Sequence, residues 1–301
     1  MSDTTSSPPP APWQKRPPCT LELPSGTVLD TAARPLVMGV LNVTPDSFSD
    51  GGRFFRPDLA AQRAREMEEV GADIIDVGGE STRPGSEPVS AKEEMRRVIP
   101  VVEELAAEST TPVSIDTQKA EVAREALRKG AQIINDVSGL RSDPDMAALA
   151  AESGVPVCLM HMQGTPRTMQ KAPTYDDVVS DVIGWLERRI AHAEEAGIAR
   201  AKIFADPGFG FGKTVRHNLE IMRRLHEFQR LDCPVMIGTS RKSTLGKILG
   251  AQADDRLYGT LGSVASAVLS GCHMVRVHDP GPALDVVRVC EAIRQGMEWQ
   301  G

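Results

Sequence analysis

The chain of 301 residues lacks the features that mark several large classes of protein. Its cysteines show no Cys-x-x-Cys pair, are odd in number and are scattered along the chain: Cys19, Cys158, Cys233, Cys272 and Cys290. This usage predicts a reducing compartment and argues against a disulfide framework or a zinc knuckle. Acidic residues exceed basic ones by 41 − 34 = 7, which argues against a polyanion surface such as nucleic acids bind. No apolar run approaches membrane-spanning length, so we expect no membrane partner.

The N-terminus also lacks the apolar core of a signal peptide, which favours a cytoplasmic protein. Residues 1–18 contain Ser6-Ser7-Pro8-Pro9-Pro10 and Pro17-Pro18, and this composition predicts a disordered Pro-rich tail. Residues 19–301 are long enough for one large α/β domain, and no second domain is expected. The domain is expected to open with a β-hairpin, because residues 20–23 and 27–29 flank a Pro-Ser-Gly turn.

Sequence motifs for common catalytic centres are absent as well. No His-Glu-x-x-His, Gly-x-Ser-x-Gly or paired-cysteine metal motif occurs. The segment Gly208–Thr214 resembles a phosphate-binding Walker A loop, but only three residues separate its first glycine from Gly212-Lys213, where that loop needs four. We interpret it as a flexible loop that lines the site.

Short apolar runs alternate with segments of helical periodicity. Strands are expected at residues 36–41, 74–77, 112–115, 133–134, 155–160, 202–205, 234–237 and 274–277. Helices are expected at about 58–70, from the Ser90 capping box to Leu105, 118–129, after Asp143-Pro144, 179–190, 218–229, 256–269 and 282–296. Glycines punctuate the ends of helices, where a positive φ is needed: Gly71, Gly130, Gly154, Gly197 and Gly271.

Eight strand–helix units predict an α/β fold of the (β/α)8 TIM-barrel type in a single domain. The alternative is an open doubly wound sheet, which usually shows Gly-x-Gly-x-x-Gly after its first strand. Here that turn reads Asn42-Val43-Thr44-Pro45, which favours the barrel.

Polar residues lie at the ends of most expected strands, and in a barrel these ends meet at one rim. They are Asn42, Asp76, Asp116, Asn135, His161, Asp206, Ser240-Arg241-Lys242, Arg276 and His278. A single aspartate there is ordinarily a helix cap, and Asp76 fits a cap or a structural role best because its strand continues to Val77. His161 could be a satisfied rim histidine or a working one.

Two chemical groups emerge from this set. Asp116, Asn135 and Asp206 offer the carboxylates and amide that suit a flat heterocycle with an amidine-like edge. Lys242, Arg276 and His278 suit an anion, above all a phosphate. The alternative for Lys242 and Arg276 is salt bridging to the rim carboxylates.

Eight motifs, read together, resemble the dihydropteroate synthase family of pterin-binding enzymes over roughly residues 20–297. They are Gly39–Gly52, Asp76–Gly85, Ser114–Thr117, Ile134–Asp136, Met160–Gly164, Asp206–Lys213, Ser240–Ser243 and Arg276–Asp279. The resemblance implies condensation of 6-hydroxymethyl-7,8-dihydropterin diphosphate with p-aminobenzoate, giving 7,8-dihydropteroate and diphosphate for folate biosynthesis. It also implies Mg²⁺ as cofactor, sulfonamide inhibition and a homodimer.

The resemblance assigns roles residue by residue. The pterin would be held by Asp116, Asn135, Asp206 and Lys242; the diphosphate by Asn42, Arg276 and His278; and p-aminobenzoate by Thr82, Arg83, Ser240 and Phe211. Asn42 would bind the metal. Lys242, Asp116, Arg276 and His278 would act in catalysis.

Two other functions stay open at this point. A pterin-dependent corrinoid methyltransferase resembles the same barrel but would not need the anion set of Lys242, Arg276 and His278. A non-catalytic pterin-binding paralogue is disfavoured by the intact segments 42–52 and 80–85. A turnover assay separates the three.

Overall fold

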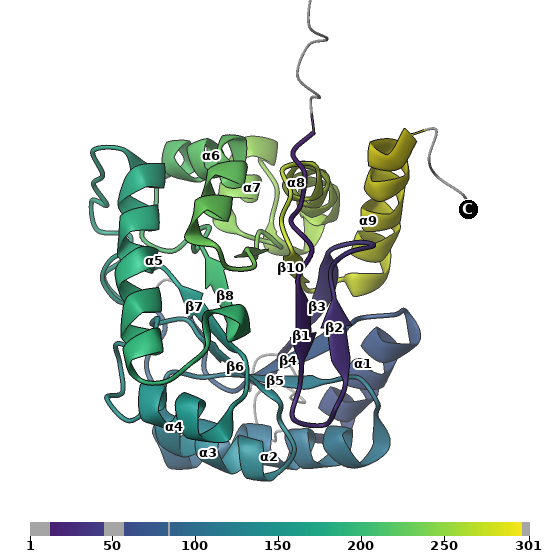
Figure 1. The fold of residues 1–301 in the computed structure, drawn as a ribbon, viewed down its shortest axis with the longest axis vertical. Coiled ribbons are helices and arrows are strands. Elements are labelled where there is room, and N and C mark those ends of the chain that lie inside the picture. The colour runs from purple at the N-terminus through teal and green to yellow at the C-terminus, as the bar shows by residue number, and fades with distance from the viewer. Residues whose placement is uncertain (1–12, 45–56, 84, 297–301) are drawn as a thin grey trace, which may run out of the picture.

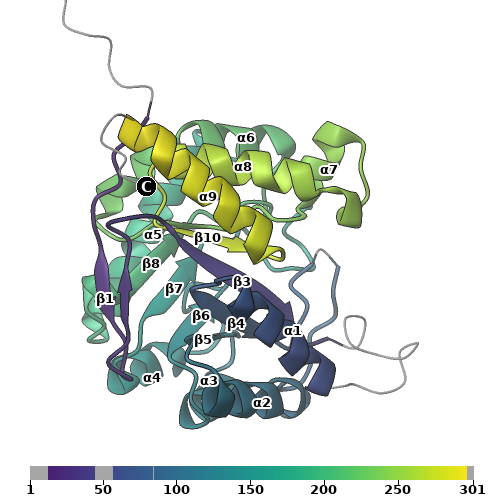
Figure 2. The ribbon, with the colours of Figure 1, turned by 90° about the vertical axis from the view of Figure 1, so that its right-hand side faces the viewer.

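The computed structural model describes residues 13–44, 57–83 and 85–296. Within these residues, parallel strands form a sheet in the order β8-β7-β6-β5-β4-β3-β10-β9, with helices outside it (Figures 1 and 2). The strands are β3 (Leu36–Asn42), β4 (Ile74–Gly78), β5 (Val113–Asp116), β6 (Ile133–Asp136), β7 (Val157–Met160), β8 (Ile203–Asp206), β9 (Met236–Ile237) and β10 (Met274–Val277). A parallel bridge between Ala205 and Val235 joins the two ends of the sheet. The predicted (β/α)8 barrel is confirmed.

The helices follow the predicted alternation, with differences in detail. They are α1 (Pro57–Glu69), α2 (Ala91–Glu108), α3 (Ala120–Arg128), α4 (Met146–Ser153), α5 (Val178–Glu195), α6 (Val215–Arg223), α7 (Ser243–Leu249), α8 (Leu257–Leu269) and α9 (Pro280–Gln295). The expected helix at 218–229 is wrong in its bounds, because α6 ends at Arg223 and a 3-10 helix covers Leu225–Leu231. Helix α7 was not predicted. No helix in the described part of the chain is long and apolar enough to cross a membrane.

Glycines end the helices as predicted. Gly71, Gly130, Gly154, Gly197 and Gly271 all have positive φ. At Gly130 a side chain would meet a second obstacle, since a Cβ would lie 2.4 Å from Ala106 Cβ on α2. These glycines let each helix turn back at once into the next strand.

Side chains alternate along each strand between the barrel interior and the helices. One buried cluster inside the barrel is apolar: Met38, Ile74, Ile133, Cys158, Phe204, Met236 and Met274, with Leu36. Two residues further along four of these strands, the same face carries Asp76, Asn135, Asp206 and Arg276. The barrel interior is therefore apolar towards the strand starts and polar towards the strand ends.

A hairpin covers the apolar end of the barrel. Its strands are β1 (Thr20–Glu22) and β2 (Val28–Asp30), paired with Thr20 opposite Asp30, as predicted. Three of its leucines join the apolar interior cluster: Leu21, Leu23 and Leu29. The hairpin thus lies at the end of the barrel remote from the strand ends (Figure 2), where its leucines are buried.

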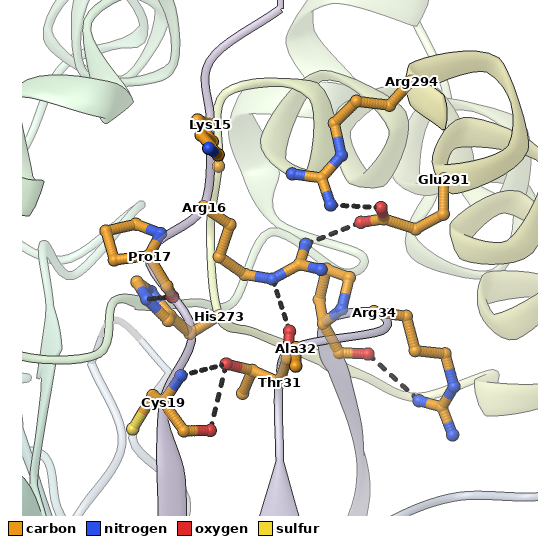
Figure 3. Close-up of polar contacts among 12 residues, drawn as sticks. Lys15, Arg16, Pro17, Cys19, Thr31, Ala32, Arg34, His273, Glu291 and Arg294 are labelled. Carbon is orange, nitrogen blue, oxygen red and sulfur yellow. Dashed lines mark hydrogen bonds and ion pairs between the residues drawn. The ribbon is translucent and has the colours of Figure 1, made fainter. Parts of the chain in front are cut away.

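The chain before the hairpin runs along the same end of the barrel. Arg16 is buried, donates from Nε to the Thr31 carbonyl at 2.8 Å and forms an ion pair with Glu291 of α9 at 2.6 Å (Figure 3). His273 Nε2 lies 3.0 Å from the Pro17 carbonyl oxygen. Most of the predicted disordered tail, residues 1–12, lies outside the described residues, whereas Arg16 and Pro17 pack against the barrel.

Candidate active site

The polar face of the barrel interior brings together side chains from four strands, β4, β5, β6 and β10. Asp76 on β4 is fully buried, and its Oδ2 accepts hydrogen bonds from Arg276 Nε at 2.6 Å and from Asn135 Nδ2 at 2.9 Å. The same guanidinium donates from Nη2 to Asp116 Oδ2 at 2.7 Å. Arg276 therefore spans the interior and bridges two carboxylates, so the salt bridges considered as an alternative for Arg276 do form.

Polar atoms in this cluster remain without partners. Asp76 Oδ1, Asn135 Oδ1 and Ser114 Oγ are buried and make no hydrogen bond. Buried polar atoms are nearly always paired in native proteins, and an unpaired one costs about 1–3 kcal/mol. The unpaired acceptor on Asn135 is therefore suited to a ligand that donates hydrogen bonds.

A small pocket opens at this cluster. Its lining combines polar residues of the predicted heterocycle set with aromatic and aliphatic side chains: Thr82, Asn135, Val137, Met160, Asp206, Phe209, Phe211, Gly238, Lys242 and Arg276. Asp206 Oδ1 accepts from the Gly208 N–H at 2.7 Å, and Lys242 Nζ lies 3.8 Å from the centre of the Phe211 ring. A planar polar ligand can use this combination of charged edge groups and aromatic faces.

Burial shifts the ionisation of the groups around the pocket. It lowers the pKa of Lys242 to about 7, and the nearby Arg276 guanidinium adds to this effect. The pKa of Asp116 is raised by burial and by the neighbouring Asp76 carboxylate, against the opposing charge of Arg276. Burial likewise raises the pKa of Asp206. Strongly shifted ionisable groups in a pocket are typical of functional sites.

The predicted anion-binding residues make different contacts in the structure. His278 Nδ1 lies 3.0 Å from Ser240 Oγ, which also accepts from the His278 backbone N–H. Burial, followed by the charges of Arg276 and Arg241, lowers the His278 pKa to about 3, which keeps the ring neutral. The Arg276 guanidinium binds the Asp76 and Asp116 carboxylates. Ser240 contacts His278, and Arg83 is exposed.

Asn42 is the last residue of β3 and is partly exposed at the rim. Among the described residues no group of three or more His, Cys, Asp or Glu side chains is placed to hold a metal ion. Mg²⁺ rarely uses such cages and usually takes one or two protein oxygens together with substrate phosphates and water. An amide oxygen at Asn42 fits that mode. Residues 45–56, which include most of the predicted motif after Asn42, lie outside the described part.

The Walker-like segment has a different role. Lys213 is buried, and its Nζ lies 2.9 Å from His161 Nδ1 and 3.0 Å from each of the Gly208 and Phe211 carbonyl oxygens. The lysine folds the loop back on itself, so its ammonium is not presented to a nucleotide. His161 is a satisfied histidine, and burial together with Lys213 lowers its pKa to about 2.

Of the two roles expected for Asp76, helix cap or structural residue, the structure shows the second: it is the central acceptor of the cluster. Sequence reasoning missed one part of this arrangement. Lys119 contacts both Glu80 and Glu94 near the pocket, and no local pattern indicated this contact.

Comparisons with known proteins follow this geometry. The family of pterin binding enzymes matches residues 38–278. The chain belongs to this family. It is 50% identical over 273 residues to the dihydropteroate synthase of Escherichia coli (strain K12), covering 91% of this chain and 96% of that protein. It is 45% identical to that of Bacillus subtilis (strain 168), covering 89% and 91%.

Solved structures of this family have the same fold. The Yersinia pestis dihydropteroate synthase with a sulfonamide drug complex superposes with a TM-score of 0.86 at 44% identity, covering 92% of this chain and 99% of that one. The Xanthomonas albilineans enzyme with 4-aminobenzoic acid gives a TM-score of 0.86 at 42% identity, with the same coverage. Another structure of the X. albilineans enzyme, in complex with 7,8-dihydropteroate, gives 0.81 at 41% identity, covering 90% and 97%.

Proposed function

We propose that this chain is a dihydropteroate synthase, a transferase of folate biosynthesis. It condenses 6-hydroxymethyl-7,8-dihydropterin diphosphate with p-aminobenzoate and releases diphosphate. The observation that supports this best is the pocket lined by Asn135, Asp206, Lys242 and Arg276 together with Phe211 and Thr82. The chain that forms it is 50% identical to the Escherichia coli dihydropteroate synthase over 91% of its length.

The pterin would occupy the polar half of the barrel interior. Asp206 keeps one carboxylate oxygen for the amino-pyrimidine edge while the other accepts from Gly208. Asn135 offers its unpaired Oδ1 as an acceptor, and Asp116 supplies a second carboxylate once Arg276 yields one of its contacts. Lys242 would donate to acceptor atoms of the ring. An edge that presents both donors and acceptors is satisfied by this set, whereas an apolar ring would leave the carboxylates unpaired.

The diphosphate would lie at the rim, between Asn42, Arg276 and His278. Asn42 would hold Mg²⁺ at the diphosphate, and the metal would supply stabilisation of negative charge on the leaving group. Arg276 offers further N–H donors, and a neutral His278 offers one ring N–H. These residues bind the anion more tightly as its charge develops, which lowers the barrier to breaking the C–O bond.

The reaction needs no nucleophile from the protein. Ionisation of the C–O bond leaves a cation that the pterin ring stabilises, and the neutral amine of p-aminobenzoate then attacks the exocyclic carbon and loses a proton. Thr82, Arg83, Ser240 and Phe211 are proposed to position this second substrate. Phe211 and Thr82 line the pocket, which supports this assignment.

The deciding experiment is release of diphosphate that requires both substrates and Mg²⁺, with dihydropteroate identified by mass spectrometry. Methyl transfer to a corrinoid protein without incorporation of p-aminobenzoate would point to the methyltransferase instead. Binding of pterin without either reaction would point to the non-catalytic paralogue.

The quaternary state and the location belong to the same proposal. We expect a cytoplasmic homodimer with a single barrel domain at residues 19–301 in each subunit. Light scattering on the purified full chain measures the first expectation, and fractionation of the source cells measures the second.

A further inference from the structure

Lys119 connects three elements beside the pocket. It is the N-cap residue of α3, shortly after Asp116 of β5. Its Nζ donates to Glu80, which follows β4, and to Glu94 Oε2 on α2 at 2.5 Å. These contacts join the segment after β4 to two helices that pack on the barrel.

Lys119, Glu80 and Glu94 form a largely buried cluster of ion pairs. The Glu94 side chain is fully buried, those of Glu80 and Lys119 are 16% and 26% exposed, and Glu94 Oε1 has no hydrogen-bond partner. Burial would lower the pKa of Lys119, but its ion pairs with Glu80 and Glu94 outweigh burial and raise it. One cation thus pairs with two carboxylates, and its removal would leave two like charges close together with little water.

The segment that Glu80 belongs to leads directly to the second-substrate residues. The Gly79 carbonyl accepts from Arg97 Nη1 at 2.8 Å, and a Cβ at Gly79 would lie 2.7 Å from Val98 Cγ1, so this backbone packs tightly on α2. Two residues after Glu80, Thr82 lines the pocket. The base of segment 79–83 is therefore fixed by Arg97 and Lys119, and the pocket residue follows at once.

We propose that Lys119 is a positioning residue for p-aminobenzoate. Through its ion pair with Glu80 it holds segment 79–83 so that Thr82 and Arg83 meet the second substrate. The proposed pterin residues come from other segments: Asp116, Asn135 and Asp206 lie on β5, β6 and β8, and Lys242 is the N-cap of α7. Loss of the ion pair between Lys119 and Glu80 should therefore weaken binding of p-aminobenzoate and leave binding of the pterin diphosphate unchanged. The choice of substrate rests on the proposed function, whereas the anchoring of the segment rests on the contacts alone.

The test compares Lys119→Met with Lys129→Met. Lys129 Nζ forms a 2.7 Å ion pair with the exposed Glu103, so it also ties α3 to α2, but at the other end of α3. In Lys119→Met we expect KM for p-aminobenzoate to rise by roughly tenfold or more, since small misplacement of a positioning group costs up to about 100-fold. KM for the pterin diphosphate should stay at the wild-type value. Lys129→Met should change neither, and Lys119→Arg should restore most of the loss.

Hydrogen exchange provides a readout that does not require turnover. The backbone amides of residues 79–83 should exchange faster in Lys119→Met than in the wild type or in Lys129→Met. If Lys119→Met does not fold, Glu80→Gln, which weakens the same link at the other partner, takes its place in both measurements. Wild-type exchange and a wild-type KM for p-aminobenzoate would overturn the proposal, as would an equal rise in both KM values. A wild-type protein that forms no dihydropteroate refutes the proposed function, and the exchange result then decides the anchoring by itself.

Discussion

Arg276 crosses the barrel interior to place Nη2 2.7 Å from Asp116 Oδ2, while its Nε lies 2.6 Å from the fully buried Asp76. The three residues sit on β10, β5 and β4. Because Asp116 is proposed to bind the pterin, the substrate must compete with Arg276 for this carboxylate. The Arg276 guanidinium can stay bonded to Asp76 when the substrate replaces it at Asp116, so its positive charge keeps a carboxylate partner.

Arg276→Ala should therefore destabilise the free protein as well as weaken substrate binding. Removing one partner of a buried ion pair costs about 3–5 kcal/mol, and here it leaves the fully buried Asp76 without its cationic partner. Urea unfolding measures this loss. The double variant Asp76→Ala/Arg276→Ala should recover part of it, because the unpaired charge is gone. A single variant as stable as the wild type would contradict the assigned ion pair.

Asp206 is expected to control pterin affinity. Asp206→Ala should weaken pterin binding by about 2–5 kcal/mol, the usual cost of truncating one partner of a buried charged hydrogen bond. Asp206→Asn should be milder, since an amide replaces one acceptor with a donor. Calorimetry on the folded variants measures both. Unchanged affinity in Asp206→Ala would remove this residue from the pterin site.

Most of the fold could be predicted from the sequence, because buried parallel strands are short apolar runs and several helices end at a glycine. The alternation of side chains then requires the polar residues at strand ends to share the barrel interior. The partners of Arg276 could not be predicted, since Asp76 and Asp116 are 200 and 160 residues away in the chain. The same holds for Lys119 and Glu80. Helix α7 was missed because its seven residues are too few to show a periodic pattern.

The Walker-like loop should bind no nucleotide. Lys213 Nζ is surrounded by His161 Nδ1 and the Gly208 and Phe211 carbonyl oxygens at 2.9 to 3.0 Å. Lys213→Met leaves these buried acceptors unpaired, at a cost of about 1–3 kcal/mol for each one that water cannot reach. We expect a clear loss of Tm in this variant, and no change in the wild-type Tm when ATP and Mg²⁺ are added. A nucleotide-dependent shift would restore the phosphate-loop interpretation.

His161 should make stability fall as the pH is lowered. Its pKa is lowered to about 2 by burial and by the charges of Lys213 and Arg141, whereas an unfolded histidine has a pKa of about 6.5. Below pH ~6.5 this histidine binds a proton in the unfolded chain but not in the folded state. The free energy of unfolding therefore falls by up to about 1.4 kcal/mol per pH unit.

In His161→Asn this contribution disappears. The difference in unfolding free energy between the wild type and the variant should therefore shrink as the pH falls from 7 to 5. Exposed His192 on α5 supplies the control His192→Asn. A difference that is independent of pH would mean that His161 titrates normally in the folded protein.

The diphosphate site is tested by ligand-dependent stability. Asn42 and His278 are partly exposed at the rim, and neither forms an ion pair among the described residues, so Asn42→Ala and His278→Ala should fold with nearly the wild-type Tm. Mg²⁺-diphosphate stabilises only a folded protein that binds it, by RT ln(1 + [L]/Kd). The increase in Tm on adding Mg²⁺-diphosphate should therefore be smaller in both variants, and Asn42→Ala should also need more Mg²⁺ for half-maximal turnover. The expected loss for each is about 1–3 kcal/mol of binding free energy, as for a hydrogen bond to a charged group. A full ligand-induced shift in both variants would place the anion elsewhere on the rim, with Arg276 and Lys242 as the remaining candidates.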